Sequence, residues 1–232
     1  MGWRTAWHGL TQLIFPQLCL SCRRAVAGSD VLLCVACSAG LPESDSYRQP
    51  ENAVTDRLAG RVSLVFGAFA YVFRDGTVCQ RLIHALKYHD RPDVGTALGA
   101  RFGERLRTTE ALQDLDGIVP VPIHPKRLRQ RGYNQAERIA AGLAEHLGVA
   151  VYPAALRRRN FQASQTRMGK LDRLDNVRDT FTAGGGDFAG KHLLLVDDVL
   201  TTGATLDFCA HALQERHPDV RISVVTLAAA ER

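Results

Sequence analysis

The stretch LLLVDDVLTTGAT, residues 193–205, places two adjacent acids at the end of an apolar run and follows them with a turn of small and hydroxyl-bearing residues. The apolar run predicts a buried strand, and the residues after the turn predict a helix. Two carboxylates at the end of a core strand are costly to bury without partners. Because α/β sheets bind ligands beyond the carboxyl ends of their strands, we expect Asp197 and Asp198 to face a ligand site.

The region around this stretch alternates between strand-like and helix-like segments. Apolar runs predict strands at 117–123, 149–154, 192–198 and 221–229. Helical spacing of apolar residues predicts helices at 77–89, 94–107 and 133–147, and a turn that leads into a helix at 201–216. The run RVSLVFGAFAYVF, 61–73, predicts a hairpin or a pair of edge strands. The alternation predicts a parallel sheet with helices on both faces.

Four cysteines near the N-terminus form two CxxC pairs with the spacing C-x2-C-x11-C-x2-C, and they are Cys19, Cys22, Cys34 and Cys37. This pattern is typical of a structural zinc site, in which four thiolates complete a tetrahedral shell. A module of about thirty residues buries little core, so the metal would supply folding energy. The alternative is a pair of disulfides, which requires an oxidising compartment. The remaining two, Cys79 and Cys209, lie in helical patterns, and we expect them to be small buried residues.

The organisation of the chain follows from its composition. A zinc module with an N-terminal helix is predicted at 1–41, a polar linker at 42–60, and the main domain at 61–232. The N-terminal stretch favours a short amphipathic helix over a signal peptide because Thr11 and Gln12 interrupt its apolar part, and a helix on a membrane surface is the alternative. No apolar run reaches the roughly 18–20 residues that span a bilayer, so we expect a cytoplasmic protein.

Positive charge is concentrated in one part of the chain. Residues 120–180 carry twelve lysines and arginines against five acids, a net charge of +7, whereas the whole chain has a formal charge of +5. This excess predicts a local anion-binding surface. An ordinary solvated basic face is the alternative.

The turn after the two acids has the composition of a phosphate site, with the residues Thr201, Thr202, Gly203, Ala204 and Thr205. Small residues at the start of a helix leave backbone N–H groups free to approach an anion. The carboxylates could accept hydrogen bonds from hydroxyls about one sugar away, or coordinate Mg²⁺. A phosphate at one end and a diol at the other describe ribose 5-phosphate. The simpler alternative is a helix N-terminus with capping threonines.

Residues 193–205 resemble, position by position, the fingerprint of type I phosphoribosyltransferases that bind 5-phosphoribosyl 1-pyrophosphate (PRPP). The wider sequence resembles the ComF family, in which a zinc module precedes such a domain. The resemblance extends from Pro16 to about Ala228 and includes the four cysteines, LKY at 86–88, VPVP at 119–122, RQRGYNQA at 129–136, Gln165, Arg173, Asn176 and Phe181. The last group also resembles the sugar-transferring domain of glutamine amidophosphoribosyltransferases. A small zinc-ribbon-like module and a type I phosphoribosyltransferase fold, which is an α/β fold, are implied.

The resemblance also implies roles for the matching residues. Asp197 and Asp198 would hold the 2′- and 3′-hydroxyls of ribose with the help of Mg²⁺, and residues 201–205 would hold the 5′-phosphate. The segment Val121–Pro125 matches the loop that binds pyrophosphate, and residues 160–176 match a flexible loop that closes over the site.

Departure of pyrophosphate leaves an oxocarbenium-like centre and a leaving group of about three negative charges, which cations must stabilise. The candidate cations are Arg129, Arg131, Arg167, Lys170 and Arg173, with Lys126, Arg127 and Lys87 as further candidates. We favour Arg131 as a catalytic residue because Gly132 beside it permits a tight turn into the next helix. His84 and His124 are candidate bases, although a lone histidine is more often structural or exposed.

Two functions from different classes fit these features. The protein could be an enzyme that transfers ribose 5-phosphate from PRPP, with Mg²⁺, to an acceptor that the sequence does not identify. Alternatively, it could be a non-catalytic module of the DNA-uptake machinery that senses PRPP and binds single-stranded DNA or DNA-uptake proteins. The ComF resemblance links the chain to natural transformation. Aromatic residues near the basic segment are limited to Tyr133, Tyr152 and Phe161, which falls short of a patterned stacking groove.

Overall fold

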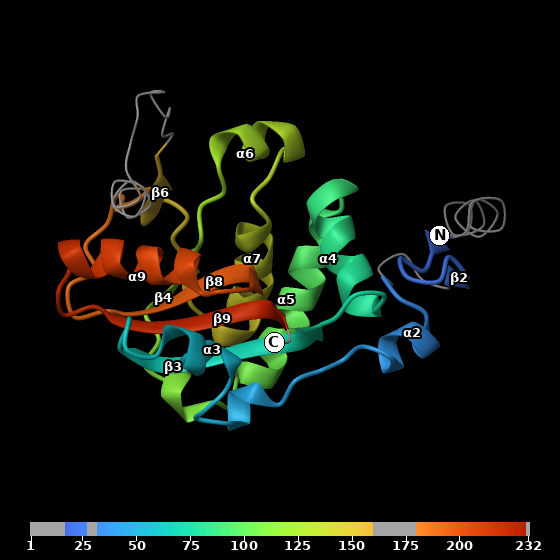
Figure 1. Cartoon of the computed structure of the whole chain (residues 1–232), viewed down its shortest axis with the longest axis horizontal. Helices are drawn as coiled ribbons and strands as arrows, with labels where there is room; N and C mark the ends of the chain where they lie inside the picture. The colour runs from blue at the N-terminus through green and yellow to red at the C-terminus, as the bar shows by residue number, and fades with distance from the viewer. Residues whose placement is uncertain (1–16, 27–31, 160–179, 231–232) are drawn as a thin grey trace, which may run out of the picture.

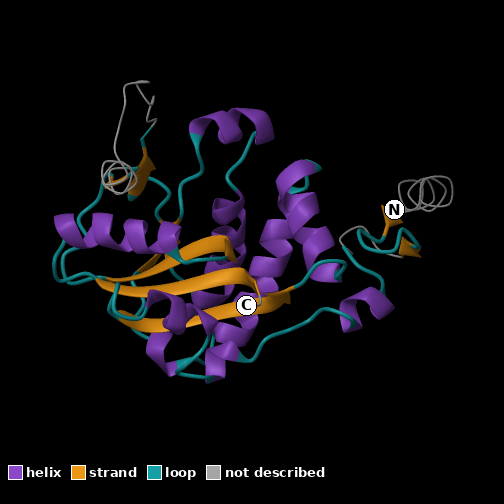
Figure 2. Cartoon of the chain, in the orientation of Figure 1, coloured by secondary structure: helices purple, strands orange, loops and turns teal. Residues whose placement is uncertain are grey.

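A computed structural model describes residues 17–26, 32–159 and 180–230 of the chain. Its centre is a five-stranded sheet in which every pair of neighbouring strands is parallel. The strands lie in the order β3 (Leu64–Phe73), β9 (Arg221–Ala230), β8 (His192–Leu200), β4 (Gly117–Pro120) and β5 (Ala150–Val151). Helices cover both faces of this sheet, as Figures 1 and 2 show. The parallel sheet and the α/β class that the sequence predicts are therefore confirmed.

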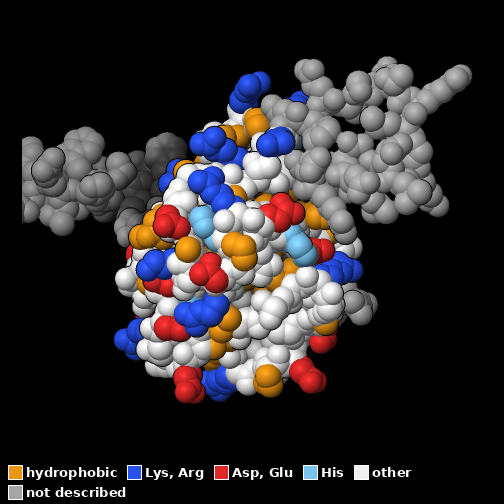
Figure 3. Space-filling view, turned by 90° about the vertical axis from the view of Figure 1, so that its left-hand side faces the viewer, with side chains coloured by type: hydrophobic (Ala, Val, Ile, Leu, Met, Phe, Trp, Pro, Cys, Tyr) orange, Lys and Arg blue, Asp and Glu red, His pale blue; other side chains and the backbone are white. Residues whose placement is uncertain are grey.

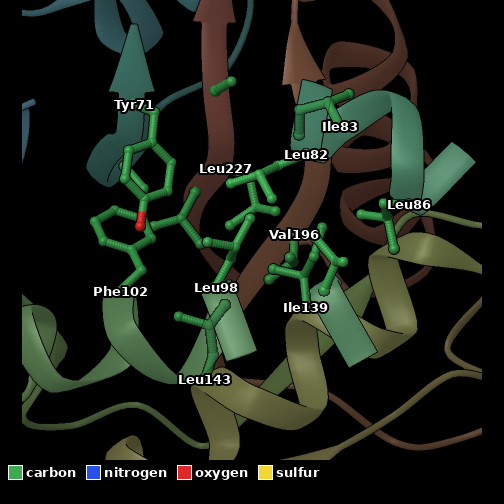
Figure 4. Close-up of a cluster of buried hydrophobic side chains, with 14 of the residues drawn as sticks. Tyr71, Leu82, Ile83, Leu86, Leu98, Phe102, Ile139, Leu143, Val196 and Leu227 are labelled. Carbon is green, nitrogen blue, oxygen red and sulfur yellow. The ribbon is translucent and has the colours of Figure 1, made fainter. Parts of the chain in front are cut away.

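The apolar run of β8 is buried on both faces because alternate side chains enter two different cores. Leu194 and Val196 belong to a core with α4 (Val78–Tyr88), α5 (Pro92–Leu106) and α7 (Gln135–Leu147), part of which is drawn in Figure 4. Leu193 and Leu195 belong to the opposite core, with α3 (Ala53–Leu58) and α9 (Ala204–Arg216). The two cores hold β8 rigidly up to the point where the acids begin.

Helices α5 and α7 pack closely because glycines remove side chains from their interface. A Cβ on Gly99 would lie 2.2 Å from the carbonyl oxygen of Ile139, and one on Gly142 would lie 2.0 Å from the carbonyl oxygen of Thr96. This close packing fixes the start of α7, which contributes a residue to the candidate site described below.

The segment 42–60, which the sequence predicts as a linker, carries the 3-10 helix η1 (Ser46–Arg48) and helix α3 and packs along the edge strand β3. The backbone N–H of Ser44 donates to the carbonyl of Ala70 at 2.9 Å. Asn52 donates its side-chain amide to the carbonyl of Gly67 at 2.8 Å. Val54 and Leu58 are 0% and 1% exposed. Polar residues of the segment therefore satisfy and cover an otherwise open sheet edge. The domain boundaries themselves remain a prediction.

The N-terminal part combines the antiparallel pair β1 (Gln17–Leu18) and β2 (Ala25–Val26) with the short helix α2 (Val35–Ala39). It lies beyond α4 at the right of Figure 1. Arg81 of α4 donates to the hydroxyl of Ser21 at 2.9 Å, and Arg101 of α5 donates to the hydroxyl of Ser38 at 3.1 Å. The predicted N-terminal helix falls outside the described residues.

Several local predictions differ from the structure. The segment 61–73 forms one ten-residue edge strand, β3, and the predicted hairpin is wrong. No pattern in the sequence predicted α6 (Pro125–Arg131), η2 (Glu110–Leu112), or the antiparallel pair β6 (Leu156–Arg158) and β7 (Phe181–Ala183). The other helices and strands that were predicted within the described residues are present. Among the described residues, none of the helices combines the length and the apolar character that crossing a membrane requires.

Candidate functional site

The two acids lie where the connections of the sheet diverge. β4 leads through α7 to β5 on one side, whereas the neighbouring strand β8 leads through α9 to β9 on the other. The pairing of β8 with β4 ends at Val196, while its pairing with β9 continues as far as Leu200. Residues 197–200 therefore extend past the end of β4, at the kind of switch point where open α/β sheets bind ligands.

Asp198 is held from two sides by residues that come from different helices. Its Oδ1 lies 2.9 Å from Nζ of Lys87, in the last turn of α4, and its Oδ2 accepts a 2.9 Å hydrogen bond from Nε2 of Gln135, the first residue of α7. Asp198 is 6% exposed and Gln135 is 8% exposed. The carboxylate is thus buried with both of its oxygens paired, which offsets the cost of removing its charge from water.

Asp197 has a different environment from its neighbour. Its Oδ1 accepts a hydrogen bond of 2.8 Å from the backbone N–H of Asp198. Burial and the charge of the Asp198 carboxylate raise the pKa of Asp197 to about 7, against the opposing effect of Lys87 and Arg158. A cation that approached this carboxylate would favour its ionised form. The pair therefore consists of one acid fixed by the protein and one whose charge depends on what binds beside it.

The turn at 201–205 connects the end of β8 to the first residues of α9. Gly203 is the N-cap of this thirteen-residue helix and adopts a left-handed φ of 82°. A Cβ at this position would lie 3.3 Å from Leu58 of α3, so both the backbone and the packing favour glycine here. Thr201, Thr202 and Thr205 are exposed. The turn thus presents a helix N-terminus to solvent beside the two acids, as a phosphate site requires.

The predicted cations are only partly gathered at the acids. Lys87 is at the site through its ion pair with Asp198. Arg131, at the end of α6, stacks its guanidinium over the ring of Tyr88, which follows Lys87 in α4, at 5.3 Å from the ring centroid. Arg129 is exposed on α6. Arg167 and Arg173, with Lys170 and the whole of the predicted flexible loop, lie outside the described residues.

The two histidines proposed as bases have other partners. His124 is the N-cap of α6 and accepts a 3.1 Å hydrogen bond from the N–H of Lys126. His84 is exposed on α4, with its Nδ1 at 3.1 Å from Nε2 of His89. These contacts favour the structural and exposed roles that a lone histidine usually has.

Sequence reasoning assigned no role to Gln135 or Arg158. Gln135 lies inside the RQRGYNQA motif, which indicated the neighbourhood but not the contact with Asp198. Arg158, the last residue of β6, is the middle one of three consecutive arginines, and the sequence does not distinguish it from its neighbours. Its guanidinium lies over the ring of Phe181 at 5.1 Å and lowers the pKa of Asp197 electrostatically.

Buried polar atoms without partners mark the same region. Within the described residues, four buried side-chain nitrogen or oxygen atoms have no hydrogen-bond partner, and three of them are Nη1 of Arg131, Oε1 of Gln135 and Nε of Arg158. Such atoms are rare in folded proteins because leaving them unpaired is costly. Gln135 contacts Asp198 and Arg158 acts electrostatically on Asp197, so two of these atoms belong to residues at the acids, where a polar ligand would satisfy them.

The four N-terminal cysteines converge in the structure. Their sulfur atoms all lie within 4.8 Å of one another, and Sγ of Cys22 is 3.6 Å from Sγ of Cys34. A tetrahedral zinc with bonds of about 2.3 Å requires sulfur atoms roughly 3.8 Å apart. All six cysteines of the chain are free thiols, so the alternative of two disulfides is not formed. The cluster is compatible with a structural zinc ion.

The two remaining cysteines are buried as the sequence predicts, with Cys79 at 2% exposure and Cys209 at 0%. Burial raises the pKa of Cys79 to about 12 and also raises that of Cys209. Thiols of this kind remain protonated and unreactive.

Comparisons with known proteins agree with this architecture. Residues 132–232 match the family model described as phosphoribosyl transferase domain. The DNA utilization protein YhgH of Salmonella typhimurium (strain LT2) is 32% identical over 135 residues, which cover 57% of this chain and 59% of that protein. Competence protein ComFC of Bacillus subtilis (strain 168) is 26% identical over 212 residues, which cover 91% of this chain and 83% of that protein.

A solved structure of the glutamine phosphoribosylpyrophosphate amidotransferase from B. subtilis aligns with a TM-score of 0.42 and 22% identity, covering 61% of this chain and 30% of that one. The alignment with ComFC, by contrast, extends over nearly the whole of this chain. With a four-cysteine cluster at its N-terminus and a phosphoribosyl transferase domain after it, this chain is similar over most of its length to proteins named YhgH and ComFC.

Proposed function

We propose that the protein binds PRPP together with Mg²⁺ at the carboxyl end of β8. Asp197 and Asp198 would hold the ribose diol, and the turn at 201–205 would hold the 5′-phosphate. The observation that supports this most strongly is the position of the paired acids directly before an exposed helix N-terminus, at the switch point of the sheet. Neutral hydroxyls suit the carboxylates and an anion suits the N–H groups, so the two halves of the site match the two ends of one sugar phosphate.

The donor groups of the site fit a magnesium ion. Carboxylate oxygens are ligands that Mg²⁺ prefers, and Asp197 has a raised pKa that a neighbouring cation would lower. When bound, the ion would supply positive charge to the pyrophosphate and to the ribose oxygens. Gln135 would keep Asp198 in place through its hydrogen bond. Lys87, which pairs with Asp198 in the free protein, would leave this acid and pair with the pyrophosphate.

The second part of the proposal is transfer of the ribose 5-phosphate group. The bond between C1 and the pyrophosphate oxygen would break, and its electron pair would leave with the pyrophosphate. The acceptor would donate the electron pair of the new bond to C1. Lys87, Arg131 and Arg158 are described cations in this part of the structure, and Arg129, Arg167 and Arg173 remain candidates for the same role.

A non-catalytic role as a PRPP sensor that binds single-stranded DNA is the alternative, and helix α6 favours it. None of its seven residues is buried, and Lys126, Arg127 and Arg129 on it are exposed. In Figure 3, lysine and arginine side chains gather at the end of the molecule where α6 stands in Figure 1. The printed names of the relatives refer to DNA utilization and competence. Against this role, Tyr133 is 6% exposed and so offers no stacking surface.

We infer a location in the cytoplasm, because a reducing compartment keeps four cysteines available as zinc ligands.

Isothermal titration with PRPP and Mg²⁺ tests the site. Wild-type protein should bind, and the double variant Asp197→Asn with Asp198→Asn should lose measurable binding. Asp187→Asn, which alters an acid that is 90% exposed, serves as the control and should bind like wild type. Unchanged affinity in the double variant would refute the site. A screen of nucleobases and amines for pyrophosphate release from PRPP then tests the transfer.

The alternative has its own measurement. Binding of single-stranded DNA should be followed over a salt series, with and without PRPP. If α6 contacts the phosphates, the affinity for DNA should fall steeply as the salt concentration rises. The double variant Lys126→Gln with Arg127→Gln should show a weaker dependence of affinity on salt. Failure to bind at low salt would exclude the DNA-binding role.

A further inference from the structure

Arg57 of α3 joins the carboxyl ends of the neighbouring strands β8 and β9. It is a buried arginine, 7% exposed. Its Nη1 donates a 3.0 Å hydrogen bond to the carbonyl of Leu200, and its Nη2 donates to the carbonyl of Ala230. Leu200 is the last residue of β8 and immediately precedes the turn at 201–205, and Ala230 is the last residue of β9. One side chain therefore fixes the backbone at the point where the turn begins.

The same helix supports the other end of the turn. A Cβ on Gly203 would lie 3.3 Å from Cδ2 of Leu58 and 3.4 Å from the carbonyl oxygen of Arg57. Gly203 is the N-cap of α9, so its position determines where the helix N-terminus points. Both ends of the turn thus rest on α3.

Helix α3 is itself anchored to the sheet. Asn52, its N-cap, accepts a 2.9 Å hydrogen bond from the N–H of Val54 and donates one of 2.8 Å to the carbonyl of Gly67 in β3. Neither hydrogen bond uses the side chain of Val54. A guanidinium held on such a helix has little freedom to follow movements of the turn, so it can act as a fixed support.

We propose that Arg57 is a positioning residue for the phosphate-binding turn. By holding the carbonyl of Leu200, it sets the backbone orientation from which the N–H groups of residues 201–204 point towards a bound phosphate. The inference rests on the proposed function of that turn. It also gives the segment 42–60 a role at the site, because the part of the chain that connects the cysteine module to the sheet supplies the support.

Two readouts test this on three variants. Arg57→Met removes both hydrogen bonds, Arg57→Lys retains one donor, and Val54→Ala is the control, because Val54 is 0% exposed on the same helix without contributing a side-chain hydrogen bond. The first readout is hydrogen–deuterium exchange of the amides of 201–204 in ligand-free protein. Exchange should be about tenfold faster in Arg57→Met, intermediate in Arg57→Lys and near the wild-type rate in Val54→Ala, since hydrogen bonds from charged donors are the stronger ones.

The second readout compares two ligands. Affinity for ribose 5-phosphate should fall about tenfold in Arg57→Met, because that ligand uses the turn. Affinity for pyrophosphate, which does not use it, should stay within about twofold of wild type. A merely structural role would weaken both ligands together and would do so equally in Val54→Ala.

The outcomes separate the inference from the proposed function. Exchange in Arg57→Met no faster than in Val54→Ala, or equal losses for both ligands, would overturn the role of Arg57. If Arg57→Met does not fold, the test rests on Arg57→Lys. Wild-type exchange rates and wild-type affinities in Arg57→Lys would then overturn the role of Arg57. If wild-type protein does not bind ribose 5-phosphate, the proposed function fails, while the exchange readout still decides whether Arg57 positions the turn.

Discussion

Lys87 and Asp198 form an ion pair with 2.9 Å between Nζ and Oδ1, which joins the last turn of α4 to β8. The side chains are 23% and 8% exposed, so the pair is partly shielded from water. In the ligand-free protein the ammonium group occupies one oxygen of an acid that is proposed to hold the ribose diol. Binding of PRPP at this acid would therefore require the pair to loosen, and Lys87 would connect the stability of the free protein with the affinity of the proposed site.

Replacing Lys87 by methionine should destabilise the protein by about 1–3 kcal/mol, because Asp198 would keep a buried charge that only Gln135 contacts. Urea unfolding measures this. Lys191→Met is the matched control, since Lys191 also pairs with an acid at 2.9 Å but is 51% exposed. This variant should lose less free energy of unfolding than Lys87→Met. Equal losses in the two variants would show that the pair at the site has no special shielding.

The raised pKa of Asp197 predicts a pH dependence of stability. A carboxyl whose pKa is higher in the folded protein than in the unfolded chain contributes stability at low pH that is lost as the pH rises towards about 7. The free energy of unfolding should therefore fall between about pH 4 and pH 7 in wild type relative to Asp197→Asn. Urea unfolding of both proteins across this range checks the sign. A difference between them that does not change with pH would contradict the raised pKa.

Asp197 should also release a proton when a cation binds beside it. Apparent affinity for PRPP with Mg²⁺ is expected to increase from pH 6 to pH 8, because only the ionised carboxylate is a good ligand. Calorimetry in buffers with different ionisation enthalpies counts the protons released. The count should exceed that for PRPP and Mg²⁺ mixed without protein, and a count equal to that blank would argue against this role of Asp197.

Gly203→Ala should weaken ribose 5-phosphate binding. Alanine at a φ of 82° is strained by about 1–2 kcal/mol, and its Cβ would press on Leu58. Gly148→Ala is a matched control, because Gly148 ends α7 with a φ of 69° and an added Cβ would meet nothing within 4 Å. Both variants should lose stability in urea through backbone strain, with the larger loss in Gly203→Ala, while only Gly203→Ala should lose affinity. Equal affinities would mean that the turn does not bind the phosphate.

Metal analysis tests the cysteine module. Purified wild-type protein should contain one zinc ion per chain, and Cys22→Ser should lose it, since three thiolates no longer complete the shell. Cys79→Ala, which alters a buried cysteine outside the cluster, should retain the metal. Much less than one zinc per wild-type chain would contradict the assignment.

Features formed by residues that are close together in the sequence were predictable, whereas contacts between distant residues were not. The strand, the acids, the turn and the start of α9 follow one another within residues 193–205, so one continuous pattern contains them. The contact between Gln135 and Asp198 spans 63 residues, and the contact between Arg57 and Leu200 spans 143. No periodicity or spacing in the sequence reports such contacts, because the topology of the sheet creates them.

The packing of residues 42–60 against β3 was not predicted for a related reason. The polar residues, the prolines and the glycine of this segment have the composition of a linker. In the structure the hydroxyl of Ser46 and the amide of Asn52 bind the backbone of β3. Composition does not distinguish polar groups that satisfy a sheet edge from polar groups that face water.

The most direct test of the ribose 5-phosphate site is a crystal structure of the protein with PRPP and Mg²⁺. The account predicts the 5′-phosphate within hydrogen-bonding distance of the backbone N–H groups of residues 201–205, and the ribose hydroxyls or the metal at Asp197 and Asp198. PRPP bound elsewhere, with the pair of Lys87 and Asp198 intact and the turn empty, would contradict it.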